Sequence, residues 1–507
     1  MQERTSEGAA QQAAEVAAGS GVVFAGNLFN RGLRLLTNWY LSGALGAAGY
    51  GLYELARTVV TILASLAPLG ADRGVLLFGA RYRSSGEQER LKGTLLACFG
   101  MTLVAGPLLS LATAVAVMVF KVGSEHAGLD RALLIALPSV SVWALLILLV
   151  SVLRSAKDMW AQSLSYLVVL PLGMLVGSVV PVWMGWGLDG VLWGFVLANV
   201  VALLTALPKT WRLFGALLTD ASITPQYEVR RLLEYSLPES LSSMLFRINQ
   251  WTDTLMVAAL CTASDVGLYR VAVSLAMIGE LPSVAINTMF QPVVAELVYS
   301  AQMERLREVV RIVTRWLILL AAPVYIVMYV GQDVLLSFYE AEYASTGAAL
   351  SVLVWGQAAA VITVPVTSLI PMSGRSRLNL INALAAAGLN VVLNALFIPR
   401  WGFTGASVAT AITLVAWSGW RIAQVWWLMR CQAFSLRSLG LLGVSVAVAL
   451  LGRGLAVDRA MWLQATVTTA SVLVFAAFAW FFGMEDSDEV VTGPALRRLR
   501  RRLGRGK

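Results

Sequence analysis

Charged residues are scarce in this sequence. Lys, Arg, Asp and Glu make up 13% of its 507 residues and hydrophobic residues 58%, whereas a soluble domain carries about 25% charged residues. Apolar runs recur from residue 20 to residue 483, and the longest polar gap, at 212–237, is too short to fold alone. This composition excludes a separate soluble domain and predicts a chain that crosses the membrane many times.

Cysteine and histidine are also rare. The three cysteines, Cys98, Cys261 and Cys431, lie near different apolar segments, without a CxxC or metal-binding spacing. The single histidine, His126, lies in a polar connection, where we expect it to be solvated. We therefore predict no disulfide, no metal site and no histidine-based catalytic centre.

Fourteen apolar segments have the length of about 20 residues that a membrane-spanning helix needs. They are apolar on every face, which excludes the alternating pattern of β-barrel strands. We predict an all-α polytopic membrane protein with about 14 transmembrane helices. The predicted spans are 21–42, 52–72, 94–120, 132–153, 159–183, 188–208, 237–260, 267–291, 312–336, 347–371, 378–398, 403–425, 436–456 and 460–482.

The basic residues predict the orientation, because Lys and Arg gather on cytoplasmic loops. With the N-terminus inside, 28 of the 38 basic residues fall in inner segments and five in outer ones. We therefore expect a cytoplasmic N-terminal segment (1–20), which does not have the pattern of a signal peptide, and a basic cytoplasmic tail (484–507). The net charge of +9 then follows mostly from the orientation of the chain, and the basic tail suits an anionic inner leaflet. We therefore expect no nucleic-acid partner.

The chain contains an internal repeat. "AAGYGLYELA" (47–56) matches "ASDVGLYRVA" (263–272), and "GWGLDGVLWGFVLA" (185–198) matches "RWGFTGASVATAIT" (400–413), with an offset along the chain that is nearly the same in both matches. Six helices per repeat preserve orientation, so the two halves are expected to be related by an axis along the membrane normal, an architecture of alternating-access transporters. The predicted parts are an N-lobe (21–216), a C-lobe (217–430) and a final helix pair (431–483).

Arginines inside predicted spans are the main functional signal. An Arg near the centre of a span costs on the order of 2.5–3.5 kcal/mol, so such residues face a protein interior or a watery cavity. On the first span, Asn27, Arg31, Arg34 and Asn38 recur at helical spacing on one stripe.

The other early helices of the two halves supply further charges. Five cations stand against three anions, which predicts a net positive cavity, and an arginine fork suits phosphate or pyrophosphate. Structural ion pairs that lock the helices together are the alternative, favoured for Glu54 with Arg57. The candidates are Arg31, Arg34, Arg57, Arg247 and Arg270 for the anion, Glu54, Asp253 and Glu280 for coupling or gating, and Asn27, Asn38, Gln250, Asn287, Gln291 and Gln357 as secondary polar groups.

Three stretches resemble a known family. They are "LLEYSLPESLSSMLFRINQWTDTLMVAALCTASDVGLYRVAVSLA" (232–276), "NVVLNALFIPRWGFTGASVATAIT" (390–413) and, in the first half, "LGAAGYGLY" with the loop at 80–95. Over residues 20–430 the chain resembles the Wzx-like polysaccharide flippases of the multidrug/oligosaccharidyl-lipid/polysaccharide exporter superfamily.

This resemblance implies movement of an undecaprenyl-pyrophosphate-linked oligosaccharide from the inner to the outer leaflet of the bacterial cytoplasmic membrane, for surface or exopolysaccharide biosynthesis. The lipid-linked glycan and the bilayer would be its partners, together with a polysaccharide polymerase and other pathway proteins. It also implies that residues 436–482 form a groove for the polyprenyl tail; a peripheral packing hairpin is the alternative.

Three other functions are alternatives to a flippase. A cation-coupled multidrug exporter of the same superfamily is the nearest, although a surplus of arginine would repel cationic drugs. An enzyme acting on the same lipid carrier is disfavoured because the outer connections are short and hold no catalytic constellation. The repeat and the buried charges disfavour a scaffold. We expect no cofactor, with coupling to protons or sodium left open.

Overall fold

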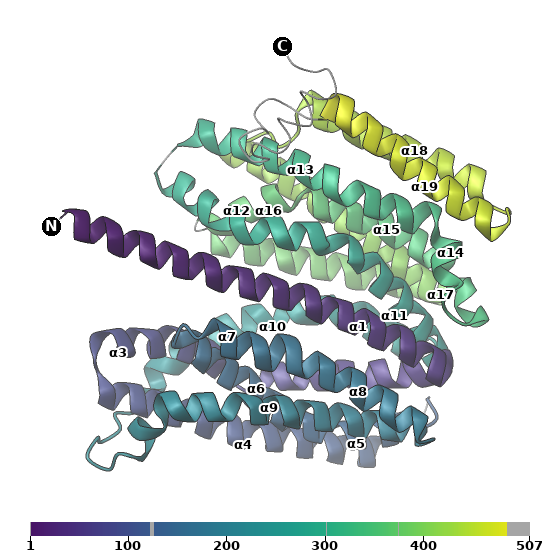
Figure 1. Ribbon diagram of the computed structural model, residues 1–507. Helices are drawn as coiled ribbons and strands as arrows, with labels where there is room; N and C mark the ends of the chain where they lie inside the picture. Colours follow the sequence, from purple (N-terminus) through teal and green to yellow (C-terminus); the bar gives the residue numbers. More distant parts are fainter. Residues whose placement is uncertain (1, 122–125, 301, 374, 484–507) are drawn as a thin grey trace. The chain divides into compact units, whose positions relative to one another are not determined.

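The computed structural model describes residues 2–121, 126–300, 302–373 and 375–483 (Figure 1). The side chains at 2–22, 24 and 237–250, and at several positions of 285–299 and at 376, lie outside what is described. In these ranges the chain is helical apart from short connections, and it contains no strand. The prediction of an all-α fold is therefore confirmed.

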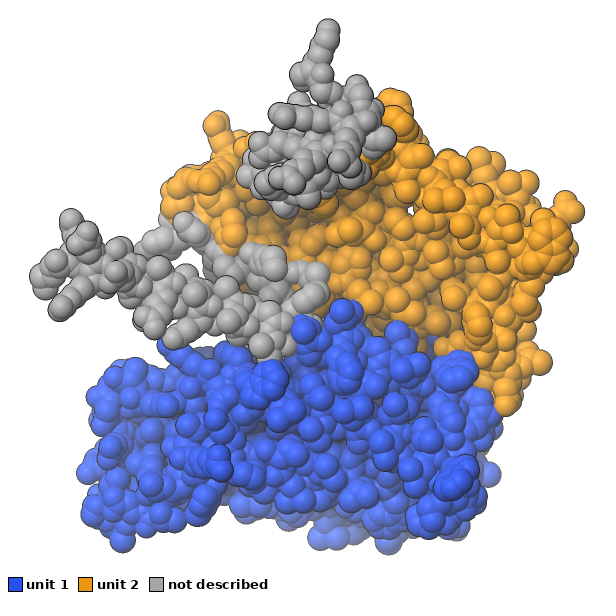
Figure 2. All heavy atoms as spheres, in the orientation of Figure 1, with its two compact units in different colours: residues 1–271, 391–406 blue, residues 272–390, 407–507 orange. Residues whose placement is uncertain are grey.

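Two compact units divide the chain (Figure 2). Unit 1 contains residues 1–271 and 391–406, and unit 2 contains residues 272–390 and 407–507. The lobe boundaries predicted from the repeat stay a prediction. The helices up to the end of unit 1 are α1 (Gln2–Leu66), α2 (Ala71–Gly74), η1 (Val75–Gly79), α3 (Ala80–Ser85), α4 (Gln88–Phe120), α5 (Leu129–Ala136), α6 (Pro138–Ser155), α7 (Met159–Gln162), η2 (Ser163–Val169), α8 (Leu170–Trp183), α9 (Gly187–Thr219), α10 (Val229–Leu260) and α11 (Ala263–Ala276).

The second half of the chain continues with shorter and longer helices. The helix α17 contributes residues 391–406 to unit 1 and its other residues to unit 2. The elements are η3 (Met277–Glu280), α12 (Leu281–Tyr299), α13 (Met303–Val330), α14 (Gln332–Leu336), η4 (Ala341–Thr346), α15 (Gly347–Ile362), α16 (Val364–Met372), α17 (Ser376–Met429), α18 (Leu436–Ala456), α19 (Met461–Phe478) and η5 (Ala479–Gly483).

Nine helices of the described chain are long and apolar enough to cross a membrane, and the bent pair Ala25–Leu66 with Ala71–Ser85 makes a tenth. The chain is thus a multi-pass membrane protein, and the count of 14 stays a prediction. The predicted span at 267–291 is not one continuous α-helix, because the 3-10 turn η3 lies between α11 and α12; the span itself stays a prediction. Pro282, the second residue of α12, has no N–H to donate to the preceding turn, which favours a break there.

Equivalent glycines support the repeat. Gly187 begins α9 with φ of 55°, and Gly402 kinks α17 with φ of 56°. The two occupy matching positions in the second pair of repeated stretches, and side chains other than hydrogen rarely accept this left-handed conformation. The predicted spans 378–398 and 403–425 are therefore the two arms of α17 around Gly402, as α8 and α9 are the two arms around Gly187.

A second glycine pair brings the two repeats together within unit 1. A Cβ added to Gly51 would overlap the carbonyl oxygen of Ala263, and a Cβ added to Gly267 would overlap that of Ala47. The repeat offset that relates Gly51 to Gly267 also relates Ala47 to Ala263. Such reciprocal contacts are those of an isologous interface around a twofold axis, so the repeats pack on each other here with pseudo-twofold symmetry.

This close approach predicts the effect of Gly51→Ala. The new methyl group has no space against backbone, so we expect a loss of about 1–3 kcal/mol of stability, as for other overpacked cores. Thermal unfolding of the purified protein in detergent measures it. Gly100→Ala on α4 is the control, because nothing lies within 4 Å of the added Cβ. Equal melting temperatures for the two variants would contradict the tight packing at Gly51.

The final helix pair packs within unit 2. Helices α18 and α19 contact α13 and each other through an apolar cluster that includes Ile326, Val330 and Phe475. Arg453 of α18 binds Asp333 of α14 with Nη1 2.7 Å from Oδ2. Residues 436–482 are thus anchored to the unit, and their predicted role in holding a lipid tail stays a prediction.

Candidate functional site

The polar stripe predicted on the first span lies on the long helix α1 (Figure 1). Asn38 is buried, Asn27 and Arg31 are half-buried, and Arg34 is exposed in unit 1. Asn27 donates from Nδ2 to the carbonyl oxygen of Val23. The four side chains of the stripe thus differ in exposure, from buried Asn38 to exposed Arg34.

One buried carboxylate holds two buried guanidinium groups in unit 1. Glu54 on α1 is fully buried, and its Oε2 accepts from Arg57 Nη2 at 2.7 Å and from Arg270 Nε at 2.8 Å. The side chains of Arg57 and Arg270 are only 7% and 6% exposed. The structural ion pair that the sequence favoured for Glu54 and Arg57 is present, and α11 adds a second cation to it.

An indole ring covers both cations. The guanidinium carbons of Arg270 and Arg57 lie 4.8 Å and 5.8 Å from the ring centre of Trp251 on α10. A cation over the face of Trp is attracted by the ring quadrupole, most strongly where water is excluded. Trp251 therefore orients both arginines. We call Glu54, Arg57, Arg270 and Trp251 the Glu54 cluster.

The Glu54 cluster carries a surplus of positive charge. Arg34 acts electrostatically on Glu54, Arg57 and Arg270, so three positive charges act on one negative charge, although only Arg57 and Arg270 bind the carboxylate. Glu54 Oε1 and Arg57 Nε are buried and have no hydrogen-bond partner in the described part of the chain. A buried charge that is not compensated destabilises the fold. An anion with several oxygens, such as phosphate, would complete the arrangement through the forked donors of arginine.

The pairing of Glu54 with Arg270 follows from the repeat. Their separation along the chain is 216 positions, and the same offset relates Gly51 to Gly267. Residues beside a twofold axis face their own equivalents. The matched stretches 47–56 and 263–272 place Glu54 and Arg270 at the same position. The repeat in the sequence was therefore enough to predict that these two residues meet.

Asp253, predicted as a coupling or gating residue, lies elsewhere in unit 1. It is 7% exposed, and its Oδ1 accepts from Nδ2 of Asn394, a fully buried residue of α17, at 2.6 Å. Asn394 lies in the stretch 390–413, which was noted only for its resemblance to a known family, so this partner of Asp253 was not predicted. A buried carboxylate with an amide donor is a site where a proton or a small cation could bind.

The other predicted residues fall into unit 2 or lie outside the description. Glu280 ends η3 and acts electrostatically on Tyr325 of α13. Asn287 on α12 accepts through Oδ1 from Ser368 Oγ at 3.2 Å, and Gln357 is half-buried on α15. The side chains of Arg247, Gln250 and Gln291, and the basic tail 484–507, lie outside the described residues.

Two buried charges in unit 2 were not foreseen. Arg421 of α17 is 8% exposed, donates from Nη2 to Asn379 Oδ1 and to the carbonyl oxygen of Thr367, and stacks on Trp417. Arg315 on α13 is 2% exposed. Both had been assigned to inner segments because they lie near the ends of the predicted spans 312–336 and 403–425.

His126 is not merely solvated, contrary to the sequence-based expectation. Its Nε2 lies 2.6 Å from the carbonyl oxygen of Ala258, close to the end of α10, where backbone carbonyls lack helical donors. The contact links the connection after α4 to α10. The three cysteines are free thiols.

Two helical repeats with guanidinium groups inside spanning helices define a polytopic membrane protein of transporter architecture. Residues 16–298 match the family model described as polysaccharide biosynthesis protein, which is more than half of the chain. The chain therefore belongs to this family. Residues 238–396 also match the MatE model.

One curated relative is the probable flippase AglR of Haloferax volcanii, 27% identical over 242 residues, or 46% of this chain and 48% of that protein. The chain thus spans about half the length of the curated relative it matches.

Solved structures with similar folds include the lipid II flippase MurJ in an inward closed conformation, with a TM-score of 0.69 and 13% identity over 90% of this chain and 99% of that chain. An inward-facing multidrug resistance MATE family transporter of the MOP superfamily has a TM-score of 0.62 and 16% identity, over 79% of this chain and 96% of that chain. The fold is that of the flippases and transporters of this superfamily, and the resemblance noted in the sequence is confirmed.

Proposed function

We propose that this protein is a flippase that moves a polyprenyl-pyrophosphate-linked oligosaccharide, on an undecaprenyl carrier, from the inner to the outer leaflet of the bacterial cytoplasmic membrane. The observation that carries the proposal is the surplus of positive charge at the Glu54 cluster: the carboxylate of Glu54 binds Arg57 and Arg270, and Arg34 acts on all three electrostatically. The family description, polysaccharide biosynthesis protein, supports a saccharide cargo, and the name of the curated relative supports flippase activity.

In this proposal the arginines neutralise the pyrophosphate during passage. Arg34 is exposed and meets the anion first, whereas Arg57 and Arg270 are held by Glu54 and Trp251. Arg31 and Arg247 would extend the cationic path, as the sequence suggests. The glycan crosses by alternating access of the two repeats, both termini lie in the cytoplasm, and a polymerase of the same pathway receives the product.

A cation-coupled exporter of small molecules is the second candidate. The MatE match covers residues 238–396, which include Asp253 and its donor Asn394. A buried carboxylate of this kind could serve coupling to protons or sodium in either function. The surplus of arginine favours an anionic substrate, because it would repel a cationic drug.

Reconstitution in proteoliposomes tests the proposal. A fluorescent undecaprenyl-pyrophosphate-linked oligosaccharide is placed in both leaflets, and the accessible fraction is followed with a membrane-impermeant quencher. We expect quenching to exceed that of protein-free vesicles, with the proton and sodium gradients varied separately. Efflux of a cationic dye is measured in parallel. Dye efflux without movement of the labelled lipid would overturn the flippase proposal in favour of the exporter.

A further inference from the structure

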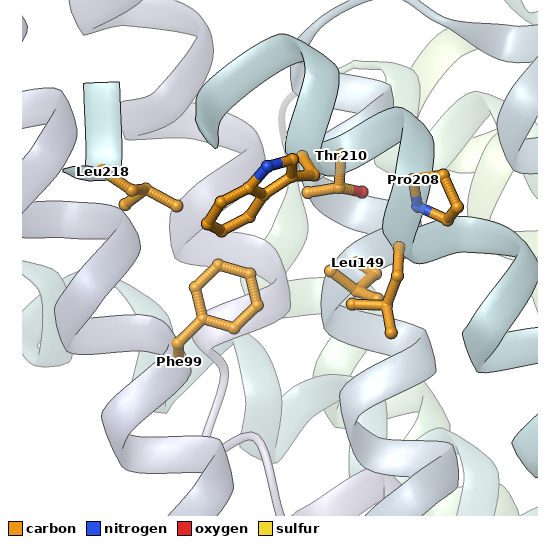
Figure 3. A pocket seen from close by; sticks show the side chains of 7 residues that line it. Phe99, Leu149, Pro208, Thr210 and Leu218 are labelled. Atoms are coloured by element: carbon orange, nitrogen blue, oxygen red, sulfur yellow. The ribbon is translucent and has the colours of Figure 1, made fainter. Parts of the chain in front are cut away.

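An apolar pocket of about 460 Å³ lies in unit 1, away from the Glu54 cluster (Figure 3). Helices α4, α6 and α9 line it as an open groove, and Figure 3 shows Phe99, Leu149, Pro208 and Leu218 around it. Its volume falls in the range of small-molecule sites. The lining residues are Phe99, Leu149, Leu207, Pro208, Thr210, Trp211 and Leu218.

The pocket sits near one end of its helices. Phe99 lies three helical turns after the start of α4 at Gln88, and Trp211 lies just over two turns before the end of α9 at Thr219. At a rise of about 1.5 Å per residue, both lie roughly 12–17 Å from that end. The predicted spans 94–120 and 188–208 place Phe99 about five residues inside the membrane and Trp211 just beyond it. The pocket therefore lies at the edge of the hydrocarbon region, which the first carbons of an acyl chain reach from the headgroup.

That end of unit 1 is basic. Arg83 on α3 lies with its guanidinium carbon 5.8 Å from the ring centre of Phe214. Phe214 follows Trp211 and precedes Leu218 on the same face of α9, so the cation lies at the edge of the pocket. No ion pair of Arg83 occurs in the described part of the chain, whereas Lys209 nearby is neutralised by Asp158 at 3.1 Å.

We propose that this pocket binds one acyl chain of an anionic glycerophospholipid, whose phosphate lies against Arg83. Lipid tails are as apolar as the pocket wall, so burial of the acyl chain alone does not favour one lipid over another. The pocket fixes the position of the chain, and the charge at Arg83 selects the headgroup. The site is separate from the proposed transport path and does not depend on it.

Native mass spectrometry of the detergent-solubilised full-length protein tests this proposal. The protein is titrated with phosphatidylglycerol and with phosphatidylcholine of equal chain length. We expect the first phosphatidylglycerol to bind roughly fivefold more tightly than phosphatidylcholine, the preference that one basic residue near the surface provides. Glycerol 3-phosphate has the anion without a chain, and we expect it not to compete.

Four variants separate the chain from the headgroup. Arg83→Ala is expected to remove the preference for phosphatidylglycerol, and Arg81→Ala, an exposed arginine of the same short helix, to keep it. Leu207→Trp enlarges a side chain that lines the pocket and is expected to weaken both lipids, whereas Leu204→Trp, exposed one turn earlier on α9 and outside the lining, is not. Equal effects within either pair, or competition by glycerol 3-phosphate, would overturn the proposal.

Discussion

Replacing Glu54 with glutamine is expected to lower the free energy of unfolding by about 3–5 kcal/mol, the range for removing one partner of a buried ion pair. The carboxylate is fully buried and accepts from two guanidinium groups that are themselves 7% and 6% exposed. The amide of glutamine keeps the shape but leaves Arg57 and Arg270 without a counter-charge. The melting temperature in detergent measures the loss.

A surface pair and a double variant make this result specific. Glu234→Gln breaks the exposed pair with Arg230, whose side chains are 63% and 94% exposed, and we expect it to change stability by at most about 1 kcal/mol. Glu54→Gln combined with Arg270→Gln removes one charge of each sign and should recover part of the loss, as coupled residues do in a double-mutant cycle. Additive losses would show that Glu54 and Arg270 do not interact.

Replacing Arg34 with alanine is expected to reduce transport of the lipid-linked saccharide about 10- to 100-fold with little change in melting temperature. Arg34 forms no ion pair among the described residues, and its charge adds to a group in which cations already outnumber the carboxylate, so its loss should cost little stability. A hydrogen bond to a charged group contributes about 1.5–3 kcal/mol, which corresponds to this reduction. The proteoliposome assay described above measures it.

The lysine variant tests the arginine fork. Arg34→Lys keeps the charge but offers a single ammonium group, so we expect activity between those of wild type and Arg34→Ala. The same order is expected at Arg31. Arg377→Ala, an exposed arginine at the start of α17, is the control for a general loss of positive charge. Full transport by Arg34→Ala would remove this residue from the path.

Much of the fold was predictable because the membrane constrains it. A spanning segment must be apolar for about 20 residues and must satisfy its own backbone, so hydropathy alone indicates helices. The repeat was readable because Gly187 and Gly402 need a conformation that few other residues accept. The break at η3 was missed because the apolar run from 267 to 291 continues through it and only Gly279 and Pro282 mark it.

The sequence predicted the type of residue that forms the candidate site, but not most of the contacts within it. Arginine in a spanning helix stands out in any sequence, and Arg34, Arg57 and Arg270 do come together. Trp251 was not predicted because an indole is ordinary in a membrane helix, and Asn394 was noted only as part of a stretch that resembles a known family. Their roles depend on which helix lies opposite, and one sequence does not give that pairing. Arg421 was overlooked because basic residues at helix ends usually serve orientation.

The contact between Glu54 and Arg270 bears on how the two repeats recognise each other. Both repeats carry this position beside the pseudo-twofold axis, one with a negative and one with a positive side chain. Two copies of the first repeat would place carboxylate against carboxylate there, and two copies of the second would place guanidinium against guanidinium. If the repeats were made as separate chains, each would therefore bind the other in preference to a second copy of itself. The charges at this one position thus favour the pairing of unlike repeats.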